Sequence, residues 1–343
     1  MSQLQRFVLM GFLCTGVSAA IARSAEPDPL AARSANTAGL ALHKKKQWGD
    51  AAEKFKQAIA LNPASPVFHY NLACAAARLG DKGTALREIT ALKNSADPDA
   101  RLKLAKAQSD PDLASLRSDP TAIETIIRGM GSEEQRSAAA EWVAMLPGFP
   151  VMGAGRVLAG AEAELAKKRL LAMPGAHFDD CDRSDVKQGR VMELVIDVDP
   201  DAPGEETVLA SLADGIGVFD RSGKLLRRGK PFECTLSGAS QDELQAIGAG
   251  HVTSVRALDV AAIYAQGGRA SWARNAELFA AKGSELVSVI HAIPETSDGK
   301  GAQGIRIESG PPAPMITTTG KGGTFLKWNA QTMKFEPAVR TRQ

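Results

Sequence analysis

Four acidic side chains in one short stretch are the clearest candidates for chemistry in this chain. Asp197, Asp199 and Asp201 alternate with other residues at the end of an apolar run, and Glu205 follows them. Carboxylates spaced in this way can converge on one hard cation, with Glu205 closing the cage, and Ca²⁺ is the cation that prefers such oxygen ligands. The sequence therefore indicates a candidate calcium site. The alternative is that the acids only make a surface loop soluble.

The histidines suggest no catalytic site. The chain has five of them, scattered, and it contains neither a His-Glu-x-x-His motif nor a Gly-x-Ser-x-Gly motif. His177 stands close to Asp179, Asp180 and Asp182, which could hold a metal, although a polar loop is the favoured interpretation. We expect no catalytic residue, no cofactor other than calcium, and a binding protein rather than an enzyme.

Residues 1–22 have the features of an export signal. Arg6 precedes an apolar run over 7–22, which ends in Ala20-Ile21-Ala22, a small-x-small pattern of the kind that signal peptidases cleave. Residues such as Gly11 and Ser18 interrupt the run and make it a poor permanent membrane span. The expected location is therefore the periplasm or the exterior, with no transmembrane segment left after cleavage.

The charge balance argues against two classes of partner. The chain has 41 basic and 39 acidic residues, a formal net charge of +2, and the leader contributes Arg6 and no acid. A chain so close to neutral has no general attraction for nucleic acid or anionic membranes. We expect neither as a partner.

Export would place the remaining cysteines in an oxidising compartment, where disulfides persist. Cys14 leaves with the leader, so Cys74, Cys181 and Cys234 remain, and an odd number allows at most one internal bridge. Cys74 lies in an alanine-rich run and is expected to be a small buried thiol. Cys181 and Cys234 lie in polar contexts and are the predicted pair, the alternative being a reactive Cys181 assisted by His177.

A repeat of 34 residues organises the first third of the chain. Ala51 and Ala85 lie at this interval, each within a helical pattern of small residues. Gly39 and Phe55 flank the first alanine, and Pro63 ends that unit. This pattern resembles the tetratricopeptide repeat (TPR) family, whose helix-turn-helix units stack because none can bury its apolar face alone.

Two further units follow the first. The second runs from Pro66 to about Asp97 with Gly80-Asp81 at its turn, and a degenerate third extends to about residue 130. The resemblance implies a stack over 23–130 whose first helices line a concave groove for a protein or peptide. Carried onto this sequence, the groove residues are Asn36, Leu40, His43, Lys44, Tyr70, Asn71 and Arg78. The alternative is an ordinary solvated helix face.

The middle of the chain, 131–188, has helical composition over 132–146 and 157–173 and is expected to be a helical connector. Between these helices, Gly153-Ala154-Gly155-Arg156 has the wrong spacing for a dinucleotide-binding loop and is interpreted as a flexible loop.

Residues 189–343 show two-residue alternation in short runs separated by Gly, Asp and Pro, which is typical of antiparallel strands. The clearest predicted strands are 192–196, 207–211, 216–219, 286–290 and 324–328. The stretch from Val195 through the acidic loop to Asp220 resembles one blade of the FG-GAP or VCBS-type propeller families, in which such a loop binds calcium. The resemblance implies a blade-like β-meander.

Together these features predict an α+β protein, with an all-α repeat stack followed by an antiparallel β-rich domain. The expected function is that of an exported scaffold that binds a protein or peptide in the groove. The alternative is a hydrolase or another enzyme acting on envelope material, with its active site in the β domain.

Overall fold

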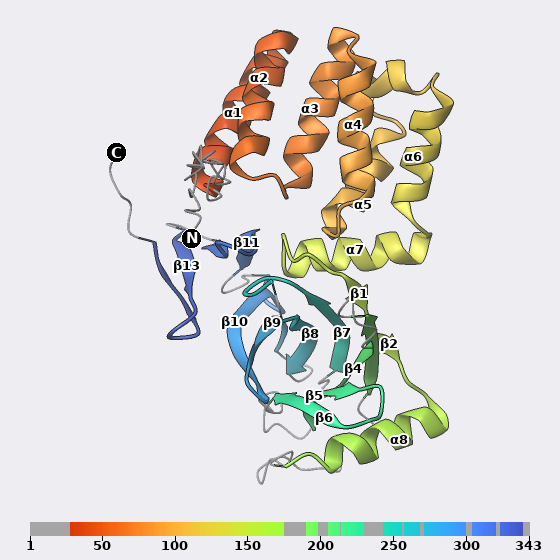
Figure 1. Cartoon of the computed structure of the whole chain (residues 1–343), viewed down its shortest axis with the longest axis vertical. Coiled ribbons are helices and arrows are strands. Elements are labelled where there is room, and N and C mark those ends of the chain that lie inside the picture. Colours follow the sequence, from red (N-terminus) through yellow and green to blue (C-terminus); the bar gives the residue numbers. More distant parts are fainter. Residues whose placement is uncertain are drawn as a thin grey trace, which may run out of the picture.

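The chain folds into a helical N-terminal half and a strand-rich C-terminal half, which confirms the α+β class (Figure 1). The computed structural model describes residues 28–174, 190–197, 205–212, 214–229, 243–255, 257–267, 271–299, 304–319 and 323–338. The helices are α1 (Pro29–Lys44), α2 (Trp48–Leu61), α3 (Pro66–Leu79), α4 (Lys82–Lys93), α5 (Pro98–Ala107), the 3-10 helix η1 (Pro111–Leu116), α6 (Pro120–Met130), α7 (Glu133–Met145) and α8 (Gly160–Leu171). Within these ranges, no helix is both long and apolar enough to cross a membrane.

Asp-Pro pairs begin α1, α5, η1 and α6. In each case the Asp side chain accepts a hydrogen bond from a backbone N–H of the first turn. The proline lies in the first turn, where a backbone N–H would have no intrahelical partner, so its missing N–H does not weaken the helix. Its ring also fixes φ at a helical value. The sequence therefore fixes these starting points locally.

The two alanines that define the repeat are completely buried at helix contacts. Gly39 shows why small residues are needed, because a Cβ added there would lie 2.5 Å from Phe55 Cε1. The helices α1 and α2 can approach this closely only without a side chain at position 39. The small-residue pattern thus encodes the packing distance between the helices of the first unit.

The third helical unit departs from the regular stack. After α5 the chain forms η1, which packs against α3, and only then α6, which packs against α4 and α5. Leu113 and Leu116 of η1 are buried in the same apolar core as Ala73 and Ala77 of α3. This core places η1 against α3, one of the two helices expected to line the groove.

The C-terminal half contains a ten-stranded sheet in the order β1-β7-β8-β9-β10-β6-β5-β4-β3-β2 and a four-stranded sheet in the order β11-β12-β13-β14. All described neighbours pair antiparallel except β10 and β6, which pair parallel. The strands are β1 (Gly153–Ala154), β2 (Arg156–Val157), β3 (Met192–Asp197), β4 (Glu205–Ser211), β5 (Gly215–Asp220), β6 (Leu225–Gly229), β7 (Glu243–Gly250), β8 (Asp259–Gly267), β9 (Trp272–Lys282), β10 (Glu285–Thr296), β11 (Ile305–Ser309), β12 (Met315–Thr318), β13 (Phe325–Asn329) and β14 (Lys334–Pro337).

The ten-stranded sheet curls into a nearly closed ring below the helices (Figure 1). Its two edge strands, β1 and β2, are consecutive in the chain and are separated only by Gly155. The Gly155 N–H donates to the Ile247 carbonyl at 2.8 Å, and a Cβ at this position would lie 2.2 Å from Ile247 Cγ1. The stretch interpreted as a flexible loop is therefore the seam of the sheet, and that interpretation is wrong.

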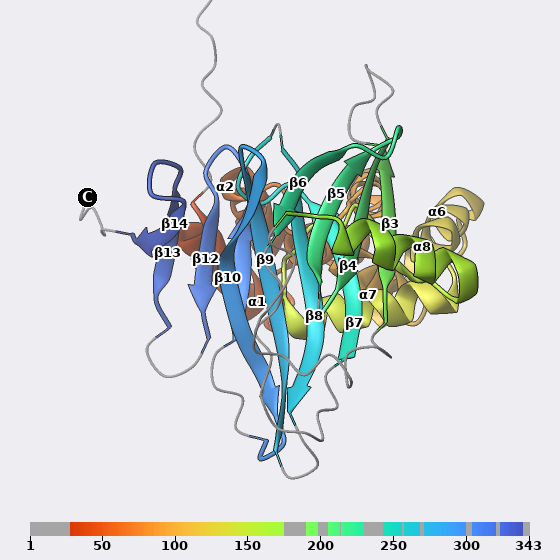
Figure 2. The same ribbon diagram turned by 90° about the horizontal axis from the view of Figure 1, so that it is seen from below.

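The predicted connector 131–188 contributes to both halves. Its helices α7 and α8 were expected, but residues 153–157 belong to the ten-stranded sheet. Trp142 and Phe149 join a core with residues from both sheets, while α8 packs on β4 and β5 and is seen in front of the strands in Figure 2. The described part of the segment, residues 131–174, therefore packs against the sheets of the C-terminal half.

All five strands expected from alternation are present, as β3, β4, β5, β10 and β13. Gly215 and Gly223 take φ of 86° and 84° in the turns of successive hairpins, as the turn chemistry predicts. The meander β3–β6 has the strand order of a blade, but it continues into the ten-stranded sheet rather than standing as a separate four-stranded unit.

Candidate functional site

The predicted groove residues separate into two groups. His43, Tyr70 and Arg78 lie where α1 and α3 meet the start of η1, and they contact Asp110 and Asp112 from that segment. Asn36 and Asn71 lie nearer the beginnings of α1 and α3 than His43 and Arg78 do, whereas Leu40 lies three residues before His43 and Tyr70 directly before Asn71. Lys44 is exposed at the end of α1. We call the part of the groove with Asn36, Leu40 and Asn71 its open end, and the part that contacts Asp110 and Asp112 its occupied end.

Tyr70 is a core residue, and its interpretation as an exposed groove anchor is wrong. Only 3% of the residue is exposed, and its hydroxyl donates a 2.6 Å hydrogen bond to Asp110 Oδ2. Burial, reinforced by this hydrogen bond, raises the pKa of the Tyr70 phenol well above its ordinary value. Lys106 Nζ lies 5.3 Å from the centre of the ring. Tyr70 holds η1 in place rather than offering a surface to a ligand.

Arg78 and His43 also lie against other residues of the chain. The Arg78 guanidinium lies 5.0 Å from the centre of the Trp48 ring, with Nε 3.7 Å from Asp112 Oδ1. His43 packs edge-on against Trp48 at 4.5 Å between ring centres, and its Nε2 lies 3.4 Å from Asp112 Oδ2. The protein's own acidic segment therefore occupies this end of the groove.

The other end of the groove remains accessible. Asn71 Nδ2 donates a 2.8 Å hydrogen bond to Asn36 Oδ1, which links the first helices of two successive units. Both asparagines are half-buried, and Leu40, one turn beyond Asn36, is 39% exposed. Two amides with spare donors and acceptors beside an apolar side chain can bind an extended peptide backbone.

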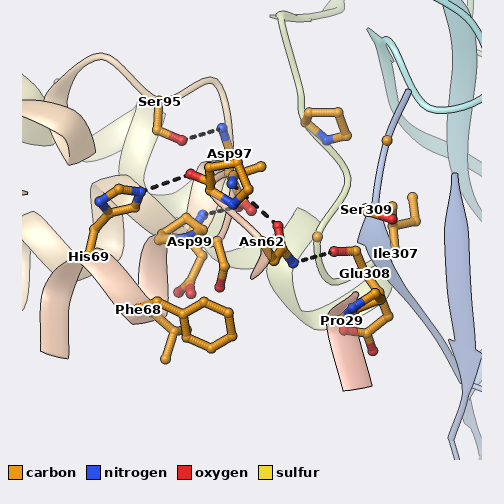
Figure 3. A pocket seen from close by; sticks show the side chains of 18 of the residues that line it. Pro29, Asn62, Phe68, His69, Ser95, Asp97, Asp99, Ile307, Glu308 and Ser309 are labelled. Carbon is orange, nitrogen blue, oxygen red and sulfur yellow. Dashed lines mark hydrogen bonds between the residues drawn. The ribbon is translucent and has the colours of Figure 1, made fainter. Parts of the chain in front are cut away.

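Asn36 also lines a cleft of about 1140 Å³ between the repeat stack and β11. On one side the cleft is bounded by the beginning of α1 and by the turns 62–66 and 95–97, and on the other by 306–311. Figure 3 shows residues from the two sides facing each other, with Asn62 reaching Glu308. Asn36 therefore belongs both to the open end of the groove and to this interdomain cleft.

Hydrogen bonds fix the position of β11 against the helices. Asn62 Nδ2 donates to the Glu308 carbonyl at 2.8 Å, and the Ile307 N–H donates to the Pro147 carbonyl at 2.8 Å. The Glu308 carboxylate pairs with Arg33 and accepts a 2.6 Å hydrogen bond from Thr317 Oγ1. These contacts join β11 to the helical half beside the cleft.

The charged groups of the cleft include both signs. Burial raises the pKa of Asp97 to about 6, against the opposing effect of the 2.9 Å hydrogen bond from the Asp99 N–H. Arg306 is exposed and makes no ion pair with the residues that the structure describes. It is therefore available to a carboxylate ligand.

His69, at the cleft wall, contacts two hydrogen-bond acceptors. Its Nδ1 lies 2.7 Å from Glu88 Oε2 and its Nε2 lies 2.8 Å from the Pro63 carbonyl oxygen. Burial acts to lower the pKa of His69, but the hydrogen bonds to Glu88 and Pro63 outweigh it and raise the pKa. Both partners are acceptors, so the arrangement favours the doubly protonated ring, in the direction of the raised pKa.

The predicted calcium ligands are described only in part. Asp197 ends β3 and Glu205 begins β4, and the two are register partners across the hairpin. Asp199 and Asp201 lie outside the described residues, as do Cys181, Cys234 and His177 with its neighbouring acids. Cys74 is a free, buried thiol, as expected. Calcium and the disulfide stay predictions.

Sequence reasoning missed Glu308, Asn62 and Asp97, which shape the cleft. Nothing in their spacing points to a site, because Asn62 and Glu308 stand 246 positions apart and meet only through the fold. The Asp97-Pro98 pair predicts the start of a helix, but it does not indicate that the Asp97 carboxyl is buried.

Residues 39–80, which run from α1 to the end of α3, match a family model described as TPR repeat. No curated protein and no solved structure matches the chain. The match supports the repeat interpretation of the helical half and, with it, a role in protein interaction. The propeller resemblance has no support from these comparisons.

Proposed function

We propose that this protein is an exported scaffold that binds an extended segment of a protein or peptide in the open end of the repeat groove and the adjoining interdomain cleft. The observation that carries the proposal is that Asn36 belongs to both surfaces, since it bonds to Asn71 in the groove and lines the cleft. The match to the TPR family supports the class of ligand.

Each part of this surface offers a different contact. The Asn36 and Asn71 amides can bond to a peptide backbone, and Leu40 offers an apolar contact. Arg306, in the cleft, can bind an acidic side chain or a terminal carboxylate. A ligand bound in this way would make contacts at several points along its length, which suits a scaffold better than a catalyst.

Selection of ligands from a displayed peptide library on the full chain tests the proposal. Leu40→Glu should weaken the selected peptides at least tenfold, about 1.4 kcal/mol, because it puts a charge at the apolar contact. Leu165→Glu is the matched control, since Leu165 is an exposed apolar residue on α8, away from the cleft. Equal affinities of the Leu40→Glu and Leu165→Glu chains would contradict the proposal.

The export part of the proposal rests on residues 1–22. Expression of the full chain in a bacterial host should yield a processed protein that begins just after Ala22 and is found outside the cytoplasm. An unprocessed N-terminus in the cytoplasmic fraction would remove the export claim and leave the binding claim untouched.

A further inference from the structure

Three segments bring metal-ligand side chains together at the occupied end of the groove. His43 comes from α1, Cys74 from α3, and Asp110 and Asp112 from the start of η1. One ligand atom from each of Cys74, Asp110 and Asp112 lies within 4.8 Å of the other two. We propose that Cys74, Asp110 and Asp112 form a binding site for a zinc-class divalent metal ion that joins the three helical units. His43 stands outside the group of mutually close ligand atoms, and its ring would shift from Asp112 toward the ion to supply the fourth ligand.

His43 supplies an independent sign of a missing ligand. Its Nε2 is buried and has no hydrogen-bond partner among the described residues, although the ring edge lies close to Asp112. The 3.4 Å between Nε2 and Asp112 Oδ2 is close to the roughly 3.3 Å that separates two ligand atoms around a tetrahedral zinc ion with bonds of about 2.0 Å. A buried nitrogen without a partner costs stability, and a bound metal ion would satisfy it.

The mixture of donors selects the metal class. A thiolate, an imidazole and carboxylates suit Zn²⁺, which binds sulfur, nitrogen and oxygen in four-coordinate sites. Calcium is excluded by the sulfur ligand, because it prefers oxygen alone. This site is thus different in chemistry from the one predicted for the β3–β4 hairpin.

The surroundings are arranged to orient the ligands. The Tyr70 hydroxyl donates a hydrogen bond to Asp110 Oδ2, and the Asp112 N–H donates one to Asp110 Oδ1 at 3.0 Å. These two bonds fix the orientation of the Asp110 carboxylate. Hydrogen bonds of this kind, one step removed from the metal, typically set the geometry of its ligands. Arg78 and Lys106 face the acids from the exposed side and compensate their charge.

Cys74 would bind the metal ion as a thiolate, because the deprotonated sulfur is the metal ligand. Metal binding would replace the S–H bond by a sulfur–metal bond and release the proton to water, so the apparent affinity should increase with pH. Only 6% of Cys74 is exposed, which protects a thiolate ligand from oxidation in an exported protein.

Cobalt substitution of the full chain tests the site. The chelator-treated protein should bind one equivalent of Co²⁺ with the intense near-ultraviolet band of a thiolate-to-cobalt transition, and Zn²⁺ should displace it and raise the melting temperature. Cys74→Ser should abolish the band, and His43→Gln should weaken zinc binding at least tenfold in a competition titration.

A second variant separates this site from the other thiols of the chain. Cys181→Ser/Cys234→Ser should keep the cobalt band and the affinity of the unsubstituted chain, since Cys74 is its remaining thiol after the leader is removed. Because Cys74 is small and buried, Cys74→Ala should melt cooperatively without metal, and zinc should not raise its melting temperature. Absence of the band, or a band that survives Cys74→Ser, would overturn the proposal.

Discussion

Asn71 Nδ2 donates a 2.8 Å hydrogen bond to Asn36 Oδ1, and this bond joins the first helices of two successive repeats at the place where the groove opens into the interdomain cleft. The two residues stand 35 positions apart, one more than the repeat, and Tyr70 is the residue that the period matches to Asn36. Neighbouring residues of a helix point in different directions, so Tyr70 reaches Asp110 while Asn71 reaches Asn36.

Asn71→Ala should separate stability from binding. Losing the half-buried hydrogen bond to Asn36 should lower the free energy of unfolding by about 1 kcal/mol. A bound peptide that forms a hydrogen bond with the Asn71 amide would lose that bond as well. We expect peptide affinity to fall at least fivefold with only a small decrease in the melting temperature. Arg78→Ala is the control, because Arg78 is engaged by Trp48 and Asp112. A larger loss of affinity for Arg78→Ala than for Asn71→Ala would show that the ligand uses the other end of the groove.

Asp97 should make stability depend on pH in an unusual direction. Its pKa is raised from 3.8 in the unfolded chain to about 6 in the fold, so the folded state binds more protons between these values. The contribution of Asp97 to stability is fully present below about pH 4 and decreases by about 2 to 3 kcal/mol as the pH rises to about 6. The measurement is urea unfolding at several pH values.

Asp97→Asn keeps the helix cap and removes the titrating group, so it should flatten this part of the stability profile. Asp119→Asn makes the same change at another Asp-Pro helix start and should retain the slope of the unsubstituted chain. Identical slopes for the Asp97→Asn and unsubstituted proteins would show that Asp97 is not protonated by burial in the fold.

The repeats, five strands and the hairpin glycines could be predicted because each has a local cause. Ala51 and Ala85 encode helix packing, and Gly215 and Gly223 encode turns. The position of η1 could not be predicted in this way, because Asp110 shows only a helix start in the sequence and its contact with Tyr70 depends on the third unit folding back.

The cleft and the seam of the sheet could not be predicted from the sequence, because they also have no local cause. Arg33 and Glu308, which pair at the cleft wall, stand 275 positions apart. The strands β1 and β2 have two residues each, too few to show alternation. Tyr70 was misinterpreted because an aromatic hydroxyl suits a binding surface and a buried hydrogen bond equally well, and the sequence does not reveal which one it meets.

Gly155→Ala should destabilise the strand-rich half. The added Cβ would lie 2.2 Å from Ile247 Cγ1, so the seam would have to open or Ile247 would have to move, at a cost of about 1 to 3 kcal/mol. Gly49→Ala is the matched control, since no atom lies within 4 Å of its added Cβ and alanine favours the helix. Chemical unfolding of both variants measures the difference. Equal stability of the two would mean that the seam is not closely packed.

Calcium should stabilise the β3–β4 hairpin. Asp197 and Glu205 are register partners at the ends of β3 and β4, and carboxylates of this stretch are the predicted calcium ligands. Millimolar Ca²⁺ should therefore raise the melting temperature, and Asp197→Asn/Glu205→Gln should abolish this rise. Glu285→Gln, at an exposed strand start, should leave it intact. No effect of Ca²⁺ on the melt of the unsubstituted chain would end the calcium hypothesis.

Hydrogen exchange with a selected peptide bound is the most direct measurement of the central claim, which is that ligands occupy the open groove and the interdomain cleft. We expect slower exchange in the first turns of α1 and α3 and in β11, with α8 unchanged, because the peptide would cover the surface that Asn36 joins. Protection confined to strands β3 to β6, with α1 and α3 exchanging as in the free protein, would contradict the account and assign binding to the β domain.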